Sequence, residues 1–193
     1  GGGRRQEKEK VEKVGLTGQT EARDIAGGGS GLRGDEPRRH ALALGTHVLG
    51  GGLTSRVVQT VREERSLAYS VCSSTAGYTD AGVVSVYAGT APERADELQK
   101  VVAGEVAEVA ANGITAAEMA IARDGFEGSI LLGLEDSGSR MFRLGTSQSL
   151  LGRVVPLDEY VETLRAVTLE DVNAVLAEVL SPEPAVAIVG SGT

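Results

Sequence analysis

The chain has 193 residues, enough for one or two domains with a sizeable hydrophobic core. Its formal net charge of −8 argues against a nucleic-acid partner, because phosphate binding requires concentrated lysine and arginine. The single cysteine, Cys72, excludes an internal disulfide bond. No apolar run approaches the ~20 residues of a membrane-spanning helix, and no segment resembles a signal peptide. We therefore predict a cytoplasmic protein with no membrane partner.

The N-terminal part of the chain is rich in glycine and charge. Residues 1–15 are polar and of low complexity, and we predict a flexible lead-in there, followed by a single domain over residues 16–193. The stretch Thr20–Ala26 can begin a strand, but Gly27–Gly29 follow at once, so we predict a short or poorly paired strand. A glycine-rich phosphate loop is the alternative reading of these glycines, although the Gly-Lys-Ser/Thr ending of such a loop is missing.

The two histidines of the chain lie on one predicted helix. Asp35-Glu36-Pro37 has the acids and the proline of a first helical turn, so we expect the helix to open there. His40 and His47 follow seven residues apart and are expected to be partly exposed. A zinc site on a helix needs histidines three or four apart and further ligands. We therefore predict no metal or cofactor site in this chain.

The pattern of the rest of the chain predicts a hairpin, several helices and a last strand. Alternating apolar residues over Tyr69–Tyr78 and Ala81–Thr90 predict an antiparallel hairpin. Capping boxes at Thr115–Glu118 and Thr168–Asp171 mark the starts of two helices. Ala185–Val189 reads as a buried strand. This order predicts an α+β fold, with a largely antiparallel sheet and helices packed on one of its faces.

The most informative stretch covers residues 49–71. Glycines 50–52 end the preceding helix, and Thr54 or Ser55 can cap a new one. Arg62, near the end of that helix, and Tyr69, at the start of the next extended segment, are seven residues apart and can emerge close together. A guanidinium and a phenol placed together can donate to a carbonyl oxygen as it gains negative charge. Taken alone, an arginine ending a helix and a tyrosine starting a strand are ordinary features.

This stretch also resembles the C-terminal-half signature of the insulinase/pitrilysin (M16) family, the inverted zinc metallopeptidases that include mitochondrial processing peptidase. The bacterial pattern L-G-G-G-x-S-S-R-L-F-Q-x-V-R-E-K-R-G-L-A-Y-S matches at Leu49–Leu53, Ser55-Arg56, Gln59, Val61-Arg62-Glu63, Arg65 and Leu67–Ser70. The departures are Val57-Val58 for the usual Leu-Phe and Ser66 for the usual Gly. The resemblance covers about residues 20–190 and implies the half-unit of the LuxS/MPP-like metallohydrolase fold.

The resemblance implies a role without zinc in this chain. In the family, zinc is held by His-x-x-Glu-His and a distant Glu in the N-terminal half, and the Glu of that motif acts as general base on the zinc-bound water. No His-x-x-Glu-His occurs here. We therefore expect the C-terminal half of a zinc metalloendopeptidase, inactive alone, which closes over a complementary zinc-bearing half or partner subunit and cleaves peptides held extended along a sheet edge.

Two residues of the signature carry the expected chemistry. Carried over from the family, Tyr69 donates to the oxyanion of the peptide substrate, and Arg62 positions the substrate or Tyr69. An exposed face lining the chamber between two halves predicts a homo- or hetero-oligomer. The alternative is a catalytically inactive structural or peptide-binding homologue, like the scaffold subunits of respiratory complexes. The presence of both Arg62 and Tyr69 favours the first reading.

Overall fold

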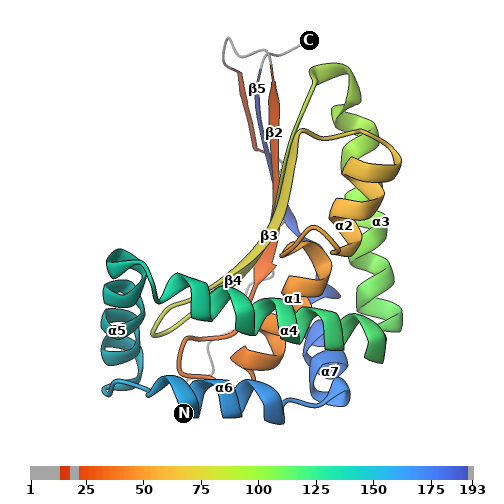
Figure 1. The fold of residues 1–193 in the computed structure, drawn as a ribbon. Helices are drawn as coiled ribbons and strands as arrows, with labels where there is room; N and C mark the ends of the chain where they lie inside the picture. The colour runs from red at the N-terminus through yellow and green to blue at the C-terminus, as the bar shows by residue number, and fades with distance from the viewer. Residues whose placement is uncertain (1–13, 18–21, 191–193) are drawn as a thin grey trace, which may run out of the picture.

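The computed structural model describes residues 14–17 and 22–190, and in these residues one sheet organises the fold (Figure 1). The sheet has five strands in the order β1-β5-β2-β4-β3. β1 pairs with β5 in parallel, and the other neighbours are antiparallel. The strands are β1 Val14–Thr17, β2 Arg23–Ser30, β3 Ser70–Gly77, β4 Gly82–Thr90 and β5 Ala185–Gly190.

Helices form the second layer. In Figure 1, α3 and α7 lie on the right, α4 crosses in front, α6 runs along the bottom and α5 stands on the left. The predicted α+β class with a largely antiparallel sheet is confirmed. The helices are α1 Arg39–Gly50, α2 Arg56–Val58, the π-helix η1 Gln59–Glu64, the 3-10 helix η2 Pro92–Arg94, α3 Ala95–Asn112, α4 Ala116–Gly133, α5 Ser137–Leu151, α6 Leu157–Ala166 and α7 Leu169–Leu180.

Alternation along β4 shows which face of the sheet the helices cover. Val84, Val86 and Ala88 are buried, whereas Val83 and Tyr87 on the opposite face are exposed. Side chains on one face of a strand recur every second residue, so one sheet face packs on the helices and the other stays open. The core between the layers includes fully buried residues of α1, α3, α6 and α7, namely Leu44, Leu49, Leu98, Leu164 and Leu176.

The two predicted capping boxes start α4 and α7. In the first, the Glu118 amide donates to the Thr115 hydroxyl at 3.3 Å, and the Thr115 amide donates to the Glu118 carboxylate at 2.7 Å. Thr168 and Asp171 make the same reciprocal pair at α7. Each box satisfies backbone donors that have no partner inside the helix. None of the helices in the described ranges is long and apolar enough to cross a bilayer.

The prediction of a short or poorly paired strand near Gly27–Gly29 is wrong. β2 has eight residues and lies inside the sheet, paired with β4 along its whole length and with β5 from Asp24 to Gly28. Ladder hydrogen bonds come from the backbone, so glycine can make them without any side chain. Gly29, Gly31 and Gly34 fall in a G-x-G-x-x-G frame that starts inside β2, but α1 begins only at Arg39, so this frame does not lead directly into a helix.

Two further predictions at the start of the domain need correction. The helix expected to open at Asp35 begins at Arg39, and Asp35 instead accepts a hydrogen bond from Arg33 at 3.0 Å in the preceding turn. His40 is buried rather than partly exposed, and its ring packs edge-on against Tyr160 with 5.0 Å between centroids. Burial lowers the pKa of His40 to about 4. Residues 1–13 of the predicted lead-in lie outside the described residues, whereas residues 14 and 15 belong to β1.

The glycines of β2 leave an apolar hollow between the sheet and the helices. The hollow has a volume of about 260 Å³, and its walls include Ile25 of β2 and Leu98, Val102 and Val106 of α3. A Cβ atom added at Gly27 would meet nothing within 4 Å, whereas one at Gly28 would lie 2.8 Å from the carbonyl oxygen of Val84. Packing is therefore incomplete beneath Gly27.

This difference between adjacent glycines gives a test of the fold. We expect Gly27→Val to raise the free energy of unfolding by about 1–2 kcal/mol, because it adds a β-branched side chain to a strand and fills apolar space. Gly28→Val, the matched control, should lower it by about 1–3 kcal/mol, because its Cβ collides with backbone. Urea denaturation of the two variants measures both. Equal effects of the two substitutions would contradict the register of β2.

Candidate functional site

The signature segment begins where α1 meets the edge strand β3. A Cβ atom at Gly50 would lie 2.9 Å from the amide nitrogen of Ser73, so glycine is required for this close approach. The Ser73 hydroxyl donates to the carbonyl oxygen of Thr46 at 2.6 Å, which ties the strand to the end of the helix. The first glycine of the motif therefore has a packing role.

The helix after the glycines begins as predicted but has an unexpected type. Ser55 occupies the N-cap position with extended backbone, and its hydroxyl donates to Gly52 O at 2.5 Å instead of accepting from the first turn. Val57, Val58 and Val61 are buried, as their spacing predicts. After three α-helical residues the chain continues as the π-helix η1. π-helical turns are rare and occur frequently at functional sites.

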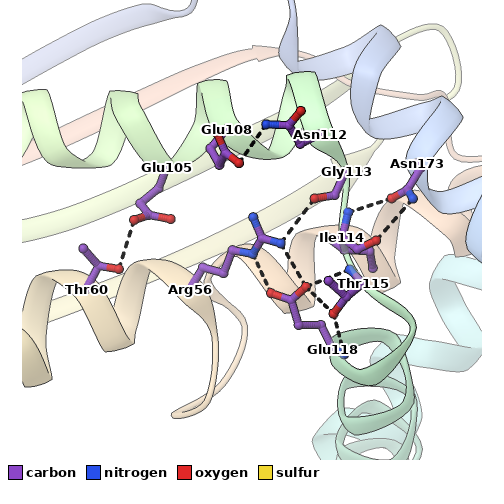
Figure 2. A network of polar contacts seen from close by, with 10 residues as sticks. All are labelled: Arg56, Thr60, Glu105, Glu108, Asn112, Gly113, Ile114, Thr115, Glu118 and Asn173. Carbon is purple, nitrogen blue, oxygen red and sulfur yellow. Dashed lines mark hydrogen bonds and ion pairs between the residues drawn. The ribbon is translucent and has the colours of Figure 1, made fainter.

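An ion pair fixes this helix to the rest of the domain (Figure 2). The Arg56 guanidinium binds both carboxylate oxygens of Glu118, with Nε to Oε1 at 2.5 Å and Nη2 to Oε2 at 2.9 Å. Arg56 Nη2 also donates to Gly113 O at 3.3 Å. The Arg56 hydrogen bond is the main reason that the pKa of Glu118 falls to about 2. Sequence reasoning found Glu118 only as a cap and missed its second partner, which comes from 62 residues earlier in the chain.

Two neighbouring contacts complete the network in Figure 2. The Thr60 hydroxyl donates to Glu105 of α3 at 3.0 Å, so the π-helix is tied to α3, just as α2 is tied to α4 through Arg56. The side chain of Asn173 on α7 bridges Ile114, accepting from its amide at 2.8 Å and donating to its carbonyl oxygen at 3.2 Å. Together these bonds hold the connection between α3 and α4 against α7 and against the signature helix, which consists of α2 and η1.

The corner between the π-helix and β3 has a strained backbone. Ser66 has φ of +52°, and it is the only residue other than glycine with positive φ in the described part of the chain. It stands where the family pattern has glycine, the residue that adopts this conformation at no steric cost. The Leu67 amide donates to Val61 O at 2.8 Å, and Arg94 donates to Ser66 O. These bonds hold the strained turn in place.

The strand that leaves this corner presents Tyr69. Thr90, which is fully buried, donates through its hydroxyl to Leu67 O, and the Tyr69 amide donates to Gly89 O at 2.9 Å. The backbone of Tyr69 is thus anchored to β4. Its side chain is 71% exposed, and the structure shows no hydrogen-bond partner for its hydroxyl among the described residues.

Arg62 lies at the other end of the same corner. Its guanidinium is about half exposed and approaches the carboxylate of Glu63 at 3.8 Å. Within the described ranges no hydrogen bond joins Arg62 to Tyr69. The structure therefore places both predicted residues on the surface, at the two ends of one anchored corner, without a direct contact between them.

The described residues do not fit a zinc ion. They contain no group of three or more His, Cys, Asp or Glu side chains that could hold a metal. His40 is packed against Tyr160, and the ring of His47 packs edge-on against Phe126 with 5.5 Å between centroids. Burial is the leading cause of a lowered pKa at both histidines. The polar groups that this segment exposes include the Tyr69 phenol and the Arg62 guanidinium, together with the side chains of Glu63, Glu64 and Arg65.

Comparison with known proteins places this geometry in a family. The family model described as the Peptidase M16 inactive domain matches residues 5–126, which is more than half of the chain. The chain belongs to the peptidase M16 family. This M16 chain is 38% identical over 181 residues to an uncharacterized zinc protease of Streptomyces coelicolor, covering 94% of the chain and 39% of that protein.

Further relatives agree with this assignment. An uncharacterized zinc protease of Mycobacterium tuberculosis is 44% identical over 152 residues, covering 79% of the chain and 35% of the relative. The crystal structure of a peptidase M16 inactive domain from Pseudomonas fluorescens superposes with a TM-score of 0.82 at 23% identity, covering 96% of the chain and 46% of that structure. The chain thus spans about two fifths of the length of the curated relatives it matches.

The Arg56–Glu118 pair makes stability depend on pH. The pKa of Glu118 falls from 4.5 to about 2 in the folded state, so its stabilising contribution is complete above pH 4.5 and is lost as pH falls toward 2. We expect Glu118→Gln to lower the free energy of unfolding by about 1–3 kcal/mol at pH 7, because a charge-assisted bond is lost. Denaturation at several pH values should show this difference shrinking below pH 4.5.

The matched control is Glu108→Gln on the preceding helix. Glu108 accepts a hydrogen bond from Asn112 within the same helix at 2.8 Å and is exposed. Its substitution should change the free energy of unfolding by less than about 0.5 kcal/mol. A Glu118→Gln effect that stays constant between pH 7 and pH 2 would contradict the assignment to this ion pair.

Proposed function

We propose that this chain is the half of an M16 metalloendopeptidase that binds no zinc, and that it closes over a zinc-bearing half and presents Tyr69 to the substrate. The observation that carries the proposal is the placement of Tyr69. Its backbone is anchored to β4, yet its ring is 71% exposed and its hydroxyl has no partner among the described residues. Such a side chain contributes little to packing and is available to a ligand.

The chemistry that Tyr69 can supply is stabilisation of developing negative charge. A phenol hydroxyl donates a hydrogen bond to a carbonyl oxygen, and the bond strengthens as that oxygen becomes an oxyanion. Arg62 adds a positive charge at the same corner, and its contact with Glu63 at 3.8 Å holds it weakly. Arg62 would position the carbonyl group or the Tyr69 ring. The metal and the water it activates would be supplied by the zinc-bearing half.

The strand next to Tyr69 supports an extended peptide as the substrate. β3 begins at Ser70, and among the described strands it forms one of the two edges of the sheet, paired with β4 on one side. An edge strand offers free amide and carbonyl groups that a second strand can bind. A peptide bound there would pass Tyr69 at the start of the edge. The proposed reaction is therefore hydrolysis within a peptide held as an added strand.

The alternative is a scaffold subunit without catalytic function, which would require different residues at the turn between η1 and β3. A scaffold needs the buried residues and ion pairs that stabilise the fold, but it does not need an exposed phenol and guanidinium. In a scaffold, substitution of Tyr69 would change neither assembly nor any peptidase activity of the complex. Substitution of the Tyr69 side chain therefore distinguishes the two functions.

Replacing Tyr69 in the assembly of this chain with its zinc-bearing half tests the proposal. We expect Tyr69→Phe to lower kcat for peptide hydrolysis by about tenfold or more, because one oxyanion donor is lost. Stability should not change, since the hydroxyl makes no hydrogen bond to the described residues.

Tyr78→Phe is the matched control, because Tyr78 is also exposed and lies at the far end of the same hairpin. It should leave kcat unchanged. Equal activity of the Tyr69→Phe and wild-type assemblies would rule out the proposed donor and leave the scaffold function.

A further inference from the structure

Helix α5 is poorly supported by the described part of the chain. It has 15 residues, and none of them is buried. Met141 is 71% exposed and Phe142 is 74% exposed. In Figure 1, α5 stands at the side of the molecule, at the end of α4, away from α3 and α7. A helix of this length is only marginally stable in water without an apolar face to pack, so the exposed side chains of α5 call for a partner.

Exposed apolar residues concentrate at the junction of α4 and α5. Of the thirteen large hydrophobic side chains that are exposed among the described residues, five lie between residues 131 and 144. Scattered exposed apolar residues are normal, but a cluster of them marks an interaction site. We call this surface the α4–α5 corner, and its members are Leu131, Leu132, Met141, Phe142 and Leu144.

Two arginines beside this corner have no carboxylate partner among the residues that the structure describes. Arg140 and Arg143 line a hollow of about 330 Å³ together with Leu134, Leu144 and Leu157. Arg143 donates from Nη1 to the carbonyl oxygen of a residue before α6 at 3.1 Å, while its Nε is buried without a partner. In the described ranges the Arg140 side chain has no hydrogen bond or ion pair, although its backbone amide donates to Asp136 O at 3.1 Å.

Arg140 and Arg143 differ in this respect from two nearby arginines. The net charge is −8, and the neighbouring arginines are paired, Arg153 with Glu159 and Arg165 with Glu127. Arg140 and Arg143 both line the hollow, and a carboxylate can bind a guanidinium through two parallel bonds. The hollow is therefore suited to a carboxylate from outside the described chain.

We infer that the α4–α5 corner is the docking surface for an apolar, acidic segment of the zinc-bearing half. This inference rests on the proposed function, which requires such a half. The relatives support the occupant: the chain covers 39% of the Streptomyces coelicolor protein and 35% of the Mycobacterium tuberculosis protein, so more than half of each lies outside the match. The segment places apolar side chains on Met141 and Phe142 and a carboxylate between Arg140 and Arg143.

The test uses the chain and the part of the Streptomyces coelicolor relative that lies outside the match, produced as a separate polypeptide whose folding is checked by circular dichroism. We expect Phe142→Asp to weaken binding by about thirtyfold and Arg140→Gln by about fivefold, as for a buried aromatic anchor and a charged neighbour. Ile121→Asp on the exposed side of α4 and Arg153→Gln are the matched controls, and each should change Kd by less than about twofold.

Hydrogen exchange gives a second readout that does not depend on a variant. The amides of α5 should exchange faster than those of α7 in the chain alone, and they should become protected when the second polypeptide binds. No binding by the wild-type chain, or binding without protection of α5, would overturn the inference. So would self-association of the chain that Phe142→Asp abolishes while binding of the second polypeptide is unchanged, because the occupant would then be a second copy.

The failure of this inference is distinguishable from failure of the proposed function. Phe142→Asp should raise Kd for the zinc-bearing half but leave kcat unchanged once that half is saturating. Tyr69→Phe should lower kcat and leave Kd unchanged. If the docking surface lay elsewhere, only the effect of Phe142→Asp on Kd would be lost. If the chain were a scaffold, only the effect of Tyr69→Phe on kcat would be lost.

Discussion

The bidentate ion pair between Arg56 and Glu118 is the constraint on which the candidate site depends. Glu118 serves two structures at once, since its carboxylate caps α4 through Thr115 and binds the first residue of the signature helix. Arg56 also reaches Gly113 O, so one guanidinium connects three segments of the chain. The π-helix that follows α2, and the corner after it, are therefore positioned from a contact at the start of α4.

After that ion pair along the chain, a strained backbone turn and hydrogen bonds to the backbone fix the position of Tyr69. Ser66 turns the chain with φ of +52°, and Arg94 and Thr90 bind the carbonyl oxygens of Ser66 and Leu67. The pairing of Tyr69 with Gly89 then starts the edge of the sheet. Strain held by surrounding contacts is typical of functional sites. The result is an anchored backbone that carries an exposed phenol.

Sequence reasoning succeeded where the signal is local. The capping boxes at Thr115 and Thr168 and the hairpin of β3 and β4 depend on residues a few positions apart, and all are confirmed. The full pairing of β2 was missed because its glycines contribute only backbone, and the partners of that backbone lie 55 or more residues away in β4 and β5. The π-helix was missed because buried valines at 57, 58 and 61 fit an α-helix equally well.

In the candidate site, too, local features could be predicted from the sequence and long-range contacts could not. Arg62 and Tyr69 could be named from the motif, but their degree of exposure could not, and the ion pair that holds the helix before Tyr69 joins residues 62 positions apart. Such pairs follow from tertiary packing, which a single sequence does not display. The same holds for α5, whose helical pattern is plain but whose lack of buried side chains appears only in the folded chain.

The most direct test of this account is the structure of the assembled enzyme, both halves together, with a bound peptide analogue that mimics the tetrahedral intermediate. The account predicts that the Tyr69 hydroxyl lies about 2.7–3.1 Å from the analogue oxygen that stands for the oxyanion. A Tyr69 ring packed into the interface between the halves, or turned away from the bound analogue, would contradict it.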